Sequence, residues 1–124
     1  MTGCGVRGPV FSPTTMVPPG KGLVYIYRPK NFVGSGVAYF VVADGARIVK
    51  LKNGGYFPYV VDPGTRVFSA KTEAMTQAAI EVQPDGVYYL KGTVTVGAFV
   101  GRPALQEVHP VIAVNEIARC RLLR

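Results

Sequence analysis

Tight-turn signals divide this chain into pieces that are long enough for β-strands and too short for most helices. Asp44-Gly45 and Asn53-Gly54 are dipeptides that favour two-residue β-hairpin loops. Asp62-Pro63-Gly64 and Pro84-Asp85-Gly86 supply two more turns through the same residue types. Turn signals at a spacing of roughly 8–12 residues are typical of antiparallel sandwiches, and they disfavour a fold of alternating strands and helices.

The pieces between the turns have the composition of strands. They are rich in valine, isoleucine, tyrosine and phenylalanine, which suit a pleated, half-buried surface. Pro58 lies inside one of them and cannot donate to a strand ladder, so that strand is predicted at a sheet edge or with a bulge. The runs that predict seven or eight strands are GLVYIYRP, GVAYFVVADG, ARIVKLKNGG, YFPYVV, TRVFSAKTE, TQAAIEV, VYYLKGTVTVGAFV and PALQEV.

Near the end of the chain, the apolar residues recur at the spacing of a helix and not of a strand. Pro110 suits the first turn of a helix, and a short helix is predicted near 110–119. The apolar residues that share its expected inward side are Val111, Val114, Ile117 and Ala118. The final CRLL closes the chain as a strand or as coil. We therefore expect a mainly β protein: a single antiparallel β-sandwich over residues 21–124, with this helix packed on one edge or face.

The first residues of the chain show neither the alternation of a strand nor the spacing of apolar residues in a helix. Residues 2–21 hold four of the ten prolines, and proline at that density resists helix and ladder pairing. Residues 1–20 are interpreted as an N-terminal tether that precedes the domain. Fully extended, this tether would reach on the order of 50 Å at about 3.3 Å per residue.

The composition is that of a folded, basic domain. Apolar residues make up 48% of the chain and charged residues 17%, and no apolar run approaches the ~20 residues of a membrane-spanning helix. The net charge of +7 favours polyanionic partners, namely nucleic acid, anionic lipid headgroups or acidic envelope polymers. The basic residues are spread singly along the chain, a pattern typical of a solvated outer face.

Catalytic residue types are few and far apart. His109 is the single histidine, it precedes Pro110 at the predicted helix start, and the chain has no G-x-S-x-G motif. Asp44, Asp62 and Asp85 all stand in turns, where their carboxylates satisfy local backbone N–H groups. One histidine and two distant cysteines do not supply a zinc site. We therefore expect a non-catalytic domain with no metal and no cofactor.

The aromatic residues, together with the positive net charge, suggest nucleic-acid binding as a second interpretation of the sequence. Seven tyrosines and six phenylalanines on a basic β-protein are similar in composition to an oligonucleotide-binding fold with stacking platforms. The tyrosines that fall inside apolar strands, where they more often fill a core, are Tyr25, Tyr27, Tyr39, Tyr88 and Tyr89. A soluble domain that binds nucleic acid or another polyanion is therefore the alternative hypothesis, and nucleic acid is not the favoured partner.

The first four residues carry a motif of their own. A bacterial lipoprotein signal ends in an apolar residue, a small residue, glycine or alanine, and a cysteine that is acylated after cleavage. Thr2-Gly3-Cys4 fits the last three positions, while Met1 stands where leucine is usual. The basic and apolar segments of such a signal would have to precede Met1. Cys4 is therefore the predicted lipidation site.

The second cysteine leaves two arrangements open. Cys4 and Cys120 lie near opposite ends of the chain and would close one long loop if they formed a disulfide. If Cys4 is acylated, Cys120 is expected to be a buried thiol behind the helix, a common place for a cysteine with apolar neighbours.

Four segments together resemble a known family. GLVYIYRP, KNGGYFPYVVDPGTRVFSAKTE, GVYYLKG and VGRPALQEV follow one another over most of residues 20–120. They resemble the bacterial domain-of-unknown-function family 2846, whose members look like small envelope lipoproteins. Arg66 departs from the family pattern, which often has histidine two residues beyond the Pro-Gly pair. The element from Gly55 to Ala70 is also similar to PEGA-type and transthyretin-like sandwiches.

This resemblance implies a location and two ligand-binding residues. It implies a periplasmic protein, anchored to the inner or outer membrane by the lipid on Cys4, with a protein or an envelope polymer as partner. It singles out Arg28 and Arg102, which each precede a proline at a strand end, where an arginine fork suits a carboxylate or a phosphate. The alternative is that each arginine pairs with a nearby acid or caps the end of the sheet.

Overall fold

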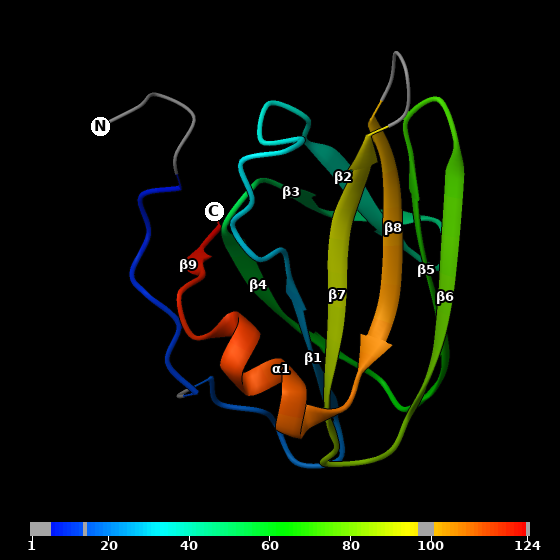
Figure 1. Cartoon of the computed structure of the whole chain (residues 1–124). Helices are drawn as coiled ribbons and strands as arrows, with labels where there is room; N and C mark the ends of the chain where they lie inside the picture. Colours follow the sequence, from blue (N-terminus) through cyan, green and yellow to red (C-terminus); the bar gives the residue numbers. More distant parts are fainter. Residues whose placement is uncertain (1–5, 14, 97–100, 124) are drawn as a thin grey trace.

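Two β-sheets face each other in the computed structural model, which describes residues 6–13, 15–96 and 101–123 (Figure 1). The elements are β1 Gly22–Tyr27, β2 Tyr39–Ala43, β3 Ala46–Leu51, β4 Gly55–Val61, β5 Gly64–Lys71, β6 Met75–Val82, β7 Val87–Val96, β8 Gly101–Val108, α1 Pro110–Ile117 and β9 Arg121–Leu122. Sheet A has the strand order β8-β7-β1-β4-β9, and sheet B has the order β3-β2-β5-β6. The predicted mainly β sandwich with a short C-terminal helix is confirmed. Within the described ranges, no helix has the length and apolar composition that crossing a bilayer demands.

The turn residues adopt the backbone conformations that their types allow. Asp44 and Gly45 have φ angles of 48° and 89°, both in the left-handed region that a type I′ hairpin turn requires. β2 and β3 pair across this turn. Gly54, with a φ of 76°, turns β3 into β4, and Asp85, with a φ of 64°, lies in the turn before β7. The predicted turns therefore occur, and they set the strand boundaries.

Two strand pairs run parallel, a difference from the purely antiparallel arrangement that was expected. β1 pairs with β4 in the antiparallel sense but with β7 in the parallel sense, and β9 lies parallel to β4. After β4 the chain crosses to sheet B, forms the β5–β6 hairpin and returns to sheet A on the other side of β1. Turn chemistry specifies where the chain reverses, but it does not specify which sheet receives the next strand.

Pro58 lies at an edge of sheet A, as predicted. It is opposite Tyr25 of β1, and β9 pairs with the other side of β4 at Gly55 and Tyr56. Beyond those two residues, β4 is the outermost strand of sheet A in the described part of the chain. The missing N–H of Pro58 therefore deprives no neighbouring strand of a hydrogen bond.

The core between the sheets is built from the inward residues of both. Val24 and Ile26 of β1 are fully buried in it. Gly92 of β7 allows the sheets to approach, because a Cβ at this position would lie 2.3 Å from Leu51 Cδ2 and 2.7 Å from the Tyr39 hydroxyl. The buried members are Val24, Ile26, Tyr39, Val41, Ala43, Val49, Leu51, Phe68, Ala70, Ile80, Val82, Leu90, Leu105 and Leu123.

α1 and the N-terminal segment cover the outer face of sheet A (Figure 1). A second hydrophobic cluster lies beneath them. Leu23, Tyr25 and Tyr27 alternate with the inward residues of β1, so this strand is buried on both faces. A strand covered on both faces is a continuous apolar run in sequence, and GLVYIY is such a run. The buried members are Leu23, Tyr25, Tyr27, Tyr56, Tyr89, Val108, Ala113, Ile117 and Cys120.

The tyrosines occupy the interior, as expected. The four that are buried among those predicted are Tyr25, Tyr27, Tyr39 and Tyr89. Tyr88 is half-buried, and its hydroxyl accepts a hydrogen bond from the Gln83 N–H at 2.7 Å. Rings buried in this way are unavailable for stacking on nucleic-acid bases.

α1 packs with a different side inward from the one predicted, and it ends at Ile117. Its buried residues are Ala113 and Ile117, and Cys120 continues the same stripe. The other residues expected inside are exposed, namely Val111, Val114 and Ala118. The small side chain of Ala113 lets α1 lie close to sheet A. The spacing of apolar residues permits either side of α1 to face inward, and packing against sheet A selects the side that carries Ala113 and Ile117.

The described part of the predicted tether lies against the domain. The Phe11 ring contacts the rings of Tyr25 and Tyr56, with both centroid distances at 5.1 Å and both ring pairs nearly perpendicular. The Phe11 N–H donates to the Cys120 carbonyl at 2.8 Å. This part of the segment is therefore packed rather than extended, and the proposed boundary at residue 20 stays a prediction.

Candidate functional site

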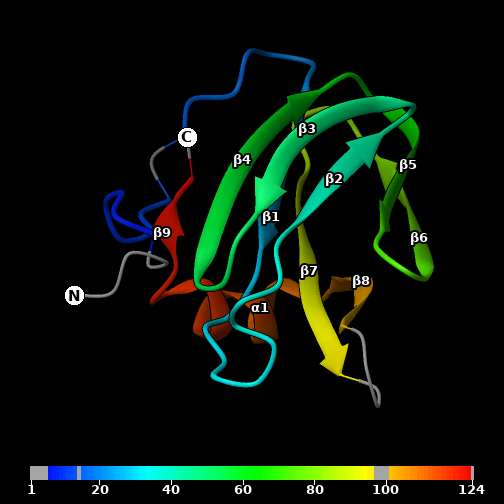
Figure 2. The ribbon, with the colours of Figure 1, turned by 90° about the horizontal axis from the view of Figure 1, so that it is seen from above.

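The sandwich has two ends with different connections. At one end, which we call the loop end, lie the β1–β2 loop (residues 28–38), the β3–β4 turn (52–54) and the β5–β6 turn (72–74). At the other, the turn end, lie the β4–β5 turn (62–63) and the β6–β7 turn (83–86). Figure 2 shows the β1–β2 loop projecting beyond the strands that it joins. Both arginines singled out in the sequence belong to the loop end.

Arg28 is buried beneath the β1–β2 loop. Its side chain is 2% exposed and follows the inward-facing series of β1. The guanidinium donates to the carbonyl oxygens of Gly34 at 2.8 Å, Val37 at 2.5 Å and Leu51 at 3.3 Å. Its Cζ lies 5.8 Å from the centroid of the Tyr39 ring. The fork that was expected to bind an anionic ligand thus binds backbone carbonyls, and Arg28 supports the loop.

Burial acts on both partners of the contact between Arg28 and Tyr39. Burial lowers the pKa of the Arg28 guanidinium, and the charge interaction with Tyr39 opposes this shift. Burial also raises the pKa of Tyr39 to about 12, although the charge of Arg28 opposes it. The Tyr39 hydroxyl donates to the Thr93 carbonyl at 2.9 Å. At neutral pH the contact therefore joins a cation to a neutral phenol.

The β1–β2 loop is also ordered by hydrogen bonds of its own. Asn31 Oδ1 accepts from the Val33 N–H at 3.0 Å, and Asn53 Oδ1 of the β3–β4 turn accepts from the Asn31 N–H at 2.9 Å. Gly34 has a φ of 77°, and its carbonyl accepts from the Val37 N–H at 3.0 Å. The loop is therefore fixed to the sandwich at its base and at its side.

Large apolar side chains are exposed at the tip of this ordered loop. Phe32 is 92% exposed and Val33 is 58% exposed, and we call this pair the apolar tip. Lys30 and Lys52 are exposed beside it. The stem of Lys30 runs along the β3–β4 turn, because a Cβ at Gly54 would lie 3.5 Å from Lys30 Cβ. The loop end thus presents apolar groups between cations.

Arg102 lies at the same end and is exposed on β8. The preceding residue, Gly101, contacts the β1–β2 loop, because a Cβ there would lie 2.9 Å from Val37 Cγ2. The Gly101 carbonyl accepts a hydrogen bond from the Thr72 hydroxyl at 2.8 Å. The structure therefore brings Arg28 and Arg102 to one end of the molecule, with the first beneath the loop and the second open to a ligand.

A polar group beneath α1 joins the helix to sheet A. Glu116 accepts hydrogen bonds from the Tyr27 hydroxyl at 2.6 Å and from Lys91 Nζ at 2.7 Å. Burial acts to raise the pKa of Glu116, but these two hydrogen bonds and the Lys91 charge outweigh it and lower the pKa. Burial and the hydrogen bond to Glu116 raise the pKa of Tyr27. The group holds α1 against β1 and β7.

Cys120 is a buried thiol behind α1, as predicted. It is 1% exposed, and its Sγ lies 3.6 Å from the Arg28 carbonyl oxygen. Burial raises the pKa of this thiol to about 11, so it is protonated at neutral pH and a poor nucleophile. Cys4, the predicted lipidation site, lies outside the described residues.

The single histidine has a structural contact at the start of α1. His109 Nδ1 accepts from the Val111 N–H at 3.2 Å, which caps the helix. Glu107, two residues earlier, is exposed. Over residues 6–13, 15–96 and 101–123, no three His, Cys, Asp or Glu side chains gather as metal ligands would.

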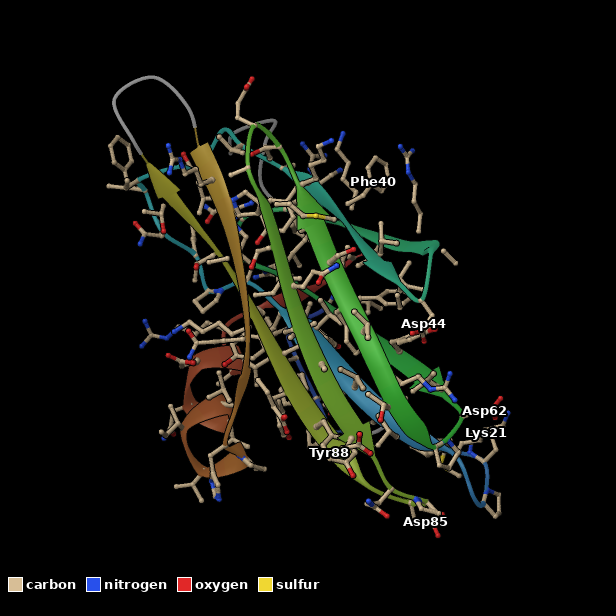
Figure 3. All side chains as sticks on the ribbon, turned by 90° about the vertical axis from the view of Figure 1, so that its right-hand side faces the viewer. Lys21, Phe40, Asp44, Asp62, Asp85 and Tyr88 are labelled. Atoms are coloured by element: carbon tan, nitrogen blue, oxygen red, sulfur yellow. The ribbon has the colours of Figure 1, made fainter. Side chains whose placement is uncertain are left out.

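Charged side chains contact one another at the turn end (Figure 3). Lys21 and Asp62 form an ion pair, and Asp85 accepts a hydrogen bond from a backbone N–H at 3.0 Å. Arg66 donates to the carbonyls of Asp62 at 2.9 Å and Pro63 at 2.8 Å. The hydrogen bond and charge of Lys21 lower the pKa of Asp62. These contacts close the β4–β5 turn.

The apolar tip was not among the predicted site residues. Phe32 and Val33 stand in the stretch KNFVGSG, between Pro29 and the next strand. The sequence signal for the apolar tip is a large aromatic residue among lysine, asparagine and glycine. The stretch around it has the apolar spacing of neither a strand nor a helix. The same signal is absent at Arg28, whose burial depends on the loop that folds over it.

Comparison with known proteins shows which family the chain belongs to. A family profile described as "Protein of unknown function (DUF2846)" matches residues 18–102. The chain belongs to this family. The matched region contains the β1–β2 loop and both arginines, and it ends before α1. Searches among curated proteins and solved structures gave no match, so the predicted similarity to PEGA and transthyretin-like sandwiches is not confirmed.

Proposed function

We propose that this DUF2846 protein is a non-catalytic bacterial envelope lipoprotein whose Cys4 carries the lipid. The β-sandwich is its binding or assembly module, held in the periplasm at the inner or outer membrane. Two acyl chains on one cysteine give stable attachment, whereas a single chain gives marginal attachment. Thr2-Gly3-Cys4 supports the proposal from the sequence, and the state of the other cysteine supports it from the structure.

The burial of Cys120 is the observation that carries the proposal. Its Sγ lies 3.6 Å from the Arg28 carbonyl and 3.9 Å from the Glu116 carbonyl, in a packed site behind α1. A disulfide would require a second sulfur about 2 Å from this Sγ. The chain has two cysteines, and the buried thiol of Cys120 supports Cys4 as the cysteine that is modified.

Mass spectrometry of the N-terminal peptide tests the proposal. The protein is produced in bacteria from its genomic locus, with the upstream sequence included, and the membrane and soluble fractions are compared. We expect acylated Cys4 in the membrane fraction, and we expect Cys4→Ser to release the protein into the soluble fraction. Cys120→Ser is the matched control and should stay in the membrane fraction. Unmodified Cys4, or a disulfide between Cys4 and Cys120, would remove the proposal.

Polyanion binding is the second candidate, and one exposed cluster favours it. Phe40 of β2 is 39% exposed (Figure 3), with Arg47 Cζ 4.3 Å and Lys50 Nζ 6.0 Å from its ring centroid. An aromatic ring flanked by cations is the unit that single-stranded nucleic-acid sites repeat. Salt-dependent retention on single-stranded DNA that is lost in Phe40→Ala would favour this function. The burial of the strand tyrosines counts against it.

A further inference from the structure

We infer that the loop end docks on an anionic lipid bilayer, with Phe32 and Val33 inserted among the headgroups and Lys30 and Lys52 against the lipid phosphates. The inference rests on the proposed function for its biological setting, and it adds the surface through which the anchored domain meets its membrane. The apolar side chains of the loop, its rigidity, its charge and the position of the first described residues each support the inference.

The apolar tip has the character of a membrane-inserting group. Phe32 is the most exposed of the large hydrophobic residues in the described part of the chain. Removing apolar surface from water is favourable in proportion to its area, and an aromatic side chain presents a large area. Arg28 and Asn31 already fix the loop, so docking would order few additional groups and lose little conformational entropy.

The charge around the tip selects an anionic surface. The exposed cations at the loop end include Lys30, Lys52, Lys71 and Arg102, and Glu73 is the acid in the described turns there. Each lysine close to an anionic bilayer strengthens binding by about fivefold. At the turn end, by contrast, Lys21 is paired with Asp62. Charge complementarity therefore favours contact through the loop end.

The first described residues of the chain lie on the half of the molecule that carries the loop end. Val6 is the second residue after Cys4, so their backbones are at most about 7 Å apart. Val6 packs against the core. Figures 1 and 2 show the first described residues on the half of the molecule that carries the β1–β2 loop, away from the β6–β7 turn. A lipid on Cys4 would hold the loop end near the headgroups.

Tryptophan fluorescence tests the insertion directly, because the chain has no tryptophan of its own. The unlipidated 124-residue chain carrying F32W is mixed with vesicles of phosphatidylglycerol and phosphatidylcholine, and with vesicles of phosphatidylcholine alone. We expect a blue shift, and quenching by brominated acyl chains, on the anionic vesicles. V111W is the matched control on α1, at a position that is 69% exposed, and it should not shift. An unshifted F32W, or equal shifts in both variants, would overturn the inference.

Sedimentation with the same anionic vesicles measures the two contributions separately. Phe32→Ala should lower the partition coefficient by about tenfold, and the K30E/K52E pair by about 30-fold or more. K30E alone should lower binding by about fivefold or more. R47E makes the same change of net charge at an exposed position beside the β2–β3 turn, away from the loop end, and it should lower binding by less than about threefold. Equal losses for K30E and R47E would mean diffuse attraction and would overturn docking through this surface.

The two proposals fail in different ways, because the vesicle experiments use a chain without lipid. Acylated Cys4 together with an unshifted F32W would keep the lipoprotein and remove the docking surface. Unmodified Cys4 together with a shifted F32W would remove the lipoprotein and keep a surface that binds anionic bilayers by itself.

Discussion

The loop end and the turn end of this sandwich differ in whether their exposed charged side chains are paired within the molecule. At the turn end, Lys21 contacts Asp62, so charge is matched within the molecule. At the loop end, the guanidinium of Arg28 donates its hydrogen bonds to backbone carbonyls, and Lys30 is exposed beside the Phe32 side chain. The comparison teaches that the arginine expected to bind a ligand is internal structure. The surface suited to a partner is the one that this arginine holds in place.

Replacing Arg28 tests the largest expected difference between the ends. Arg28→Met leaves three backbone carbonyls without their donor, and the acceptor at Leu51 is buried. A buried acceptor without a donor costs about 1–3 kcal/mol, so we expect the free energy of unfolding in urea to fall by about 3 kcal/mol. Arg28→Lys should recover only part of the loss, because an ammonium lacks the planar fork.

Arg102→Met is the matched control for this prediction. Arg102 is exposed on β8 at the same end, so its replacement should change the free energy of unfolding by less than about 0.5 kcal/mol. Equal losses at the two arginines would contradict the account, since Arg28 would then have no special part in holding the loop.

Two phenylalanines sharpen the comparison, because one is packed and the other is presented to solvent. Phe11 lies against Tyr25 and Tyr56, whereas Phe32 is 92% exposed. Phe11→Ala should lower the free energy of unfolding by about 2 kcal/mol, less than for a fully buried ring because Phe11 is half-buried. Phe32→Ala should change it by less than about 0.5 kcal/mol. A larger loss for Phe32→Ala would show that the apolar tip serves the fold.

The smallest expected effect is the pH dependence of the pair at the turn end. Lys21 lowers the pKa of Asp62 in the folded protein. The pair therefore contributes stability above the ordinary aspartate pKa of 3.8, and this contribution is lost as the pH falls through the lower folded value. Asp62→Asn should slightly lower the urea midpoint at neutral pH and leave it unchanged in acid or in about 1 M salt. A difference that grows in acid would contradict this assignment.

Local chemistry predicted most of the fold. The left-handed φ angles of Asp44, Gly45, Gly54 and Asp85 occur at turn positions whose residue types tolerate that conformation, and these turns separate the strands. The continuous apolar run of β1 also agrees with its burial on both faces. What local chemistry did not predict is the parallel pairing of β1 with β7, because the crossing between sheets depends on contacts far apart in sequence.

The candidate site was harder to predict for the same physical reason. Arg28 and Arg102 look alike in sequence, each before a proline at a strand end. Arg28 becomes internal only because the β1–β2 loop supplies carbonyl acceptors around it. Val111 was expected inside because helical spacing permits it, yet α1 turns Ala113 toward sheet A. In both cases a partner distant in sequence decides between two locally equivalent positions.

Attaching the chain to a bilayer through Cys4 tests the central claim, that the anchor and the loop end face the same membrane. Cys120 is buried with a thiol pKa of about 11, so a maleimide-bearing lipid at neutral pH should couple to Cys4. The F32W and V87W variants report the two ends, since Val87 is 44% exposed beside the β6–β7 turn. The account predicts that brominated lipids in anionic vesicles quench F32W strongly and leave V87W near its value in solution. Equal quenching of the two variants, or stronger quenching of V87W, would contradict it.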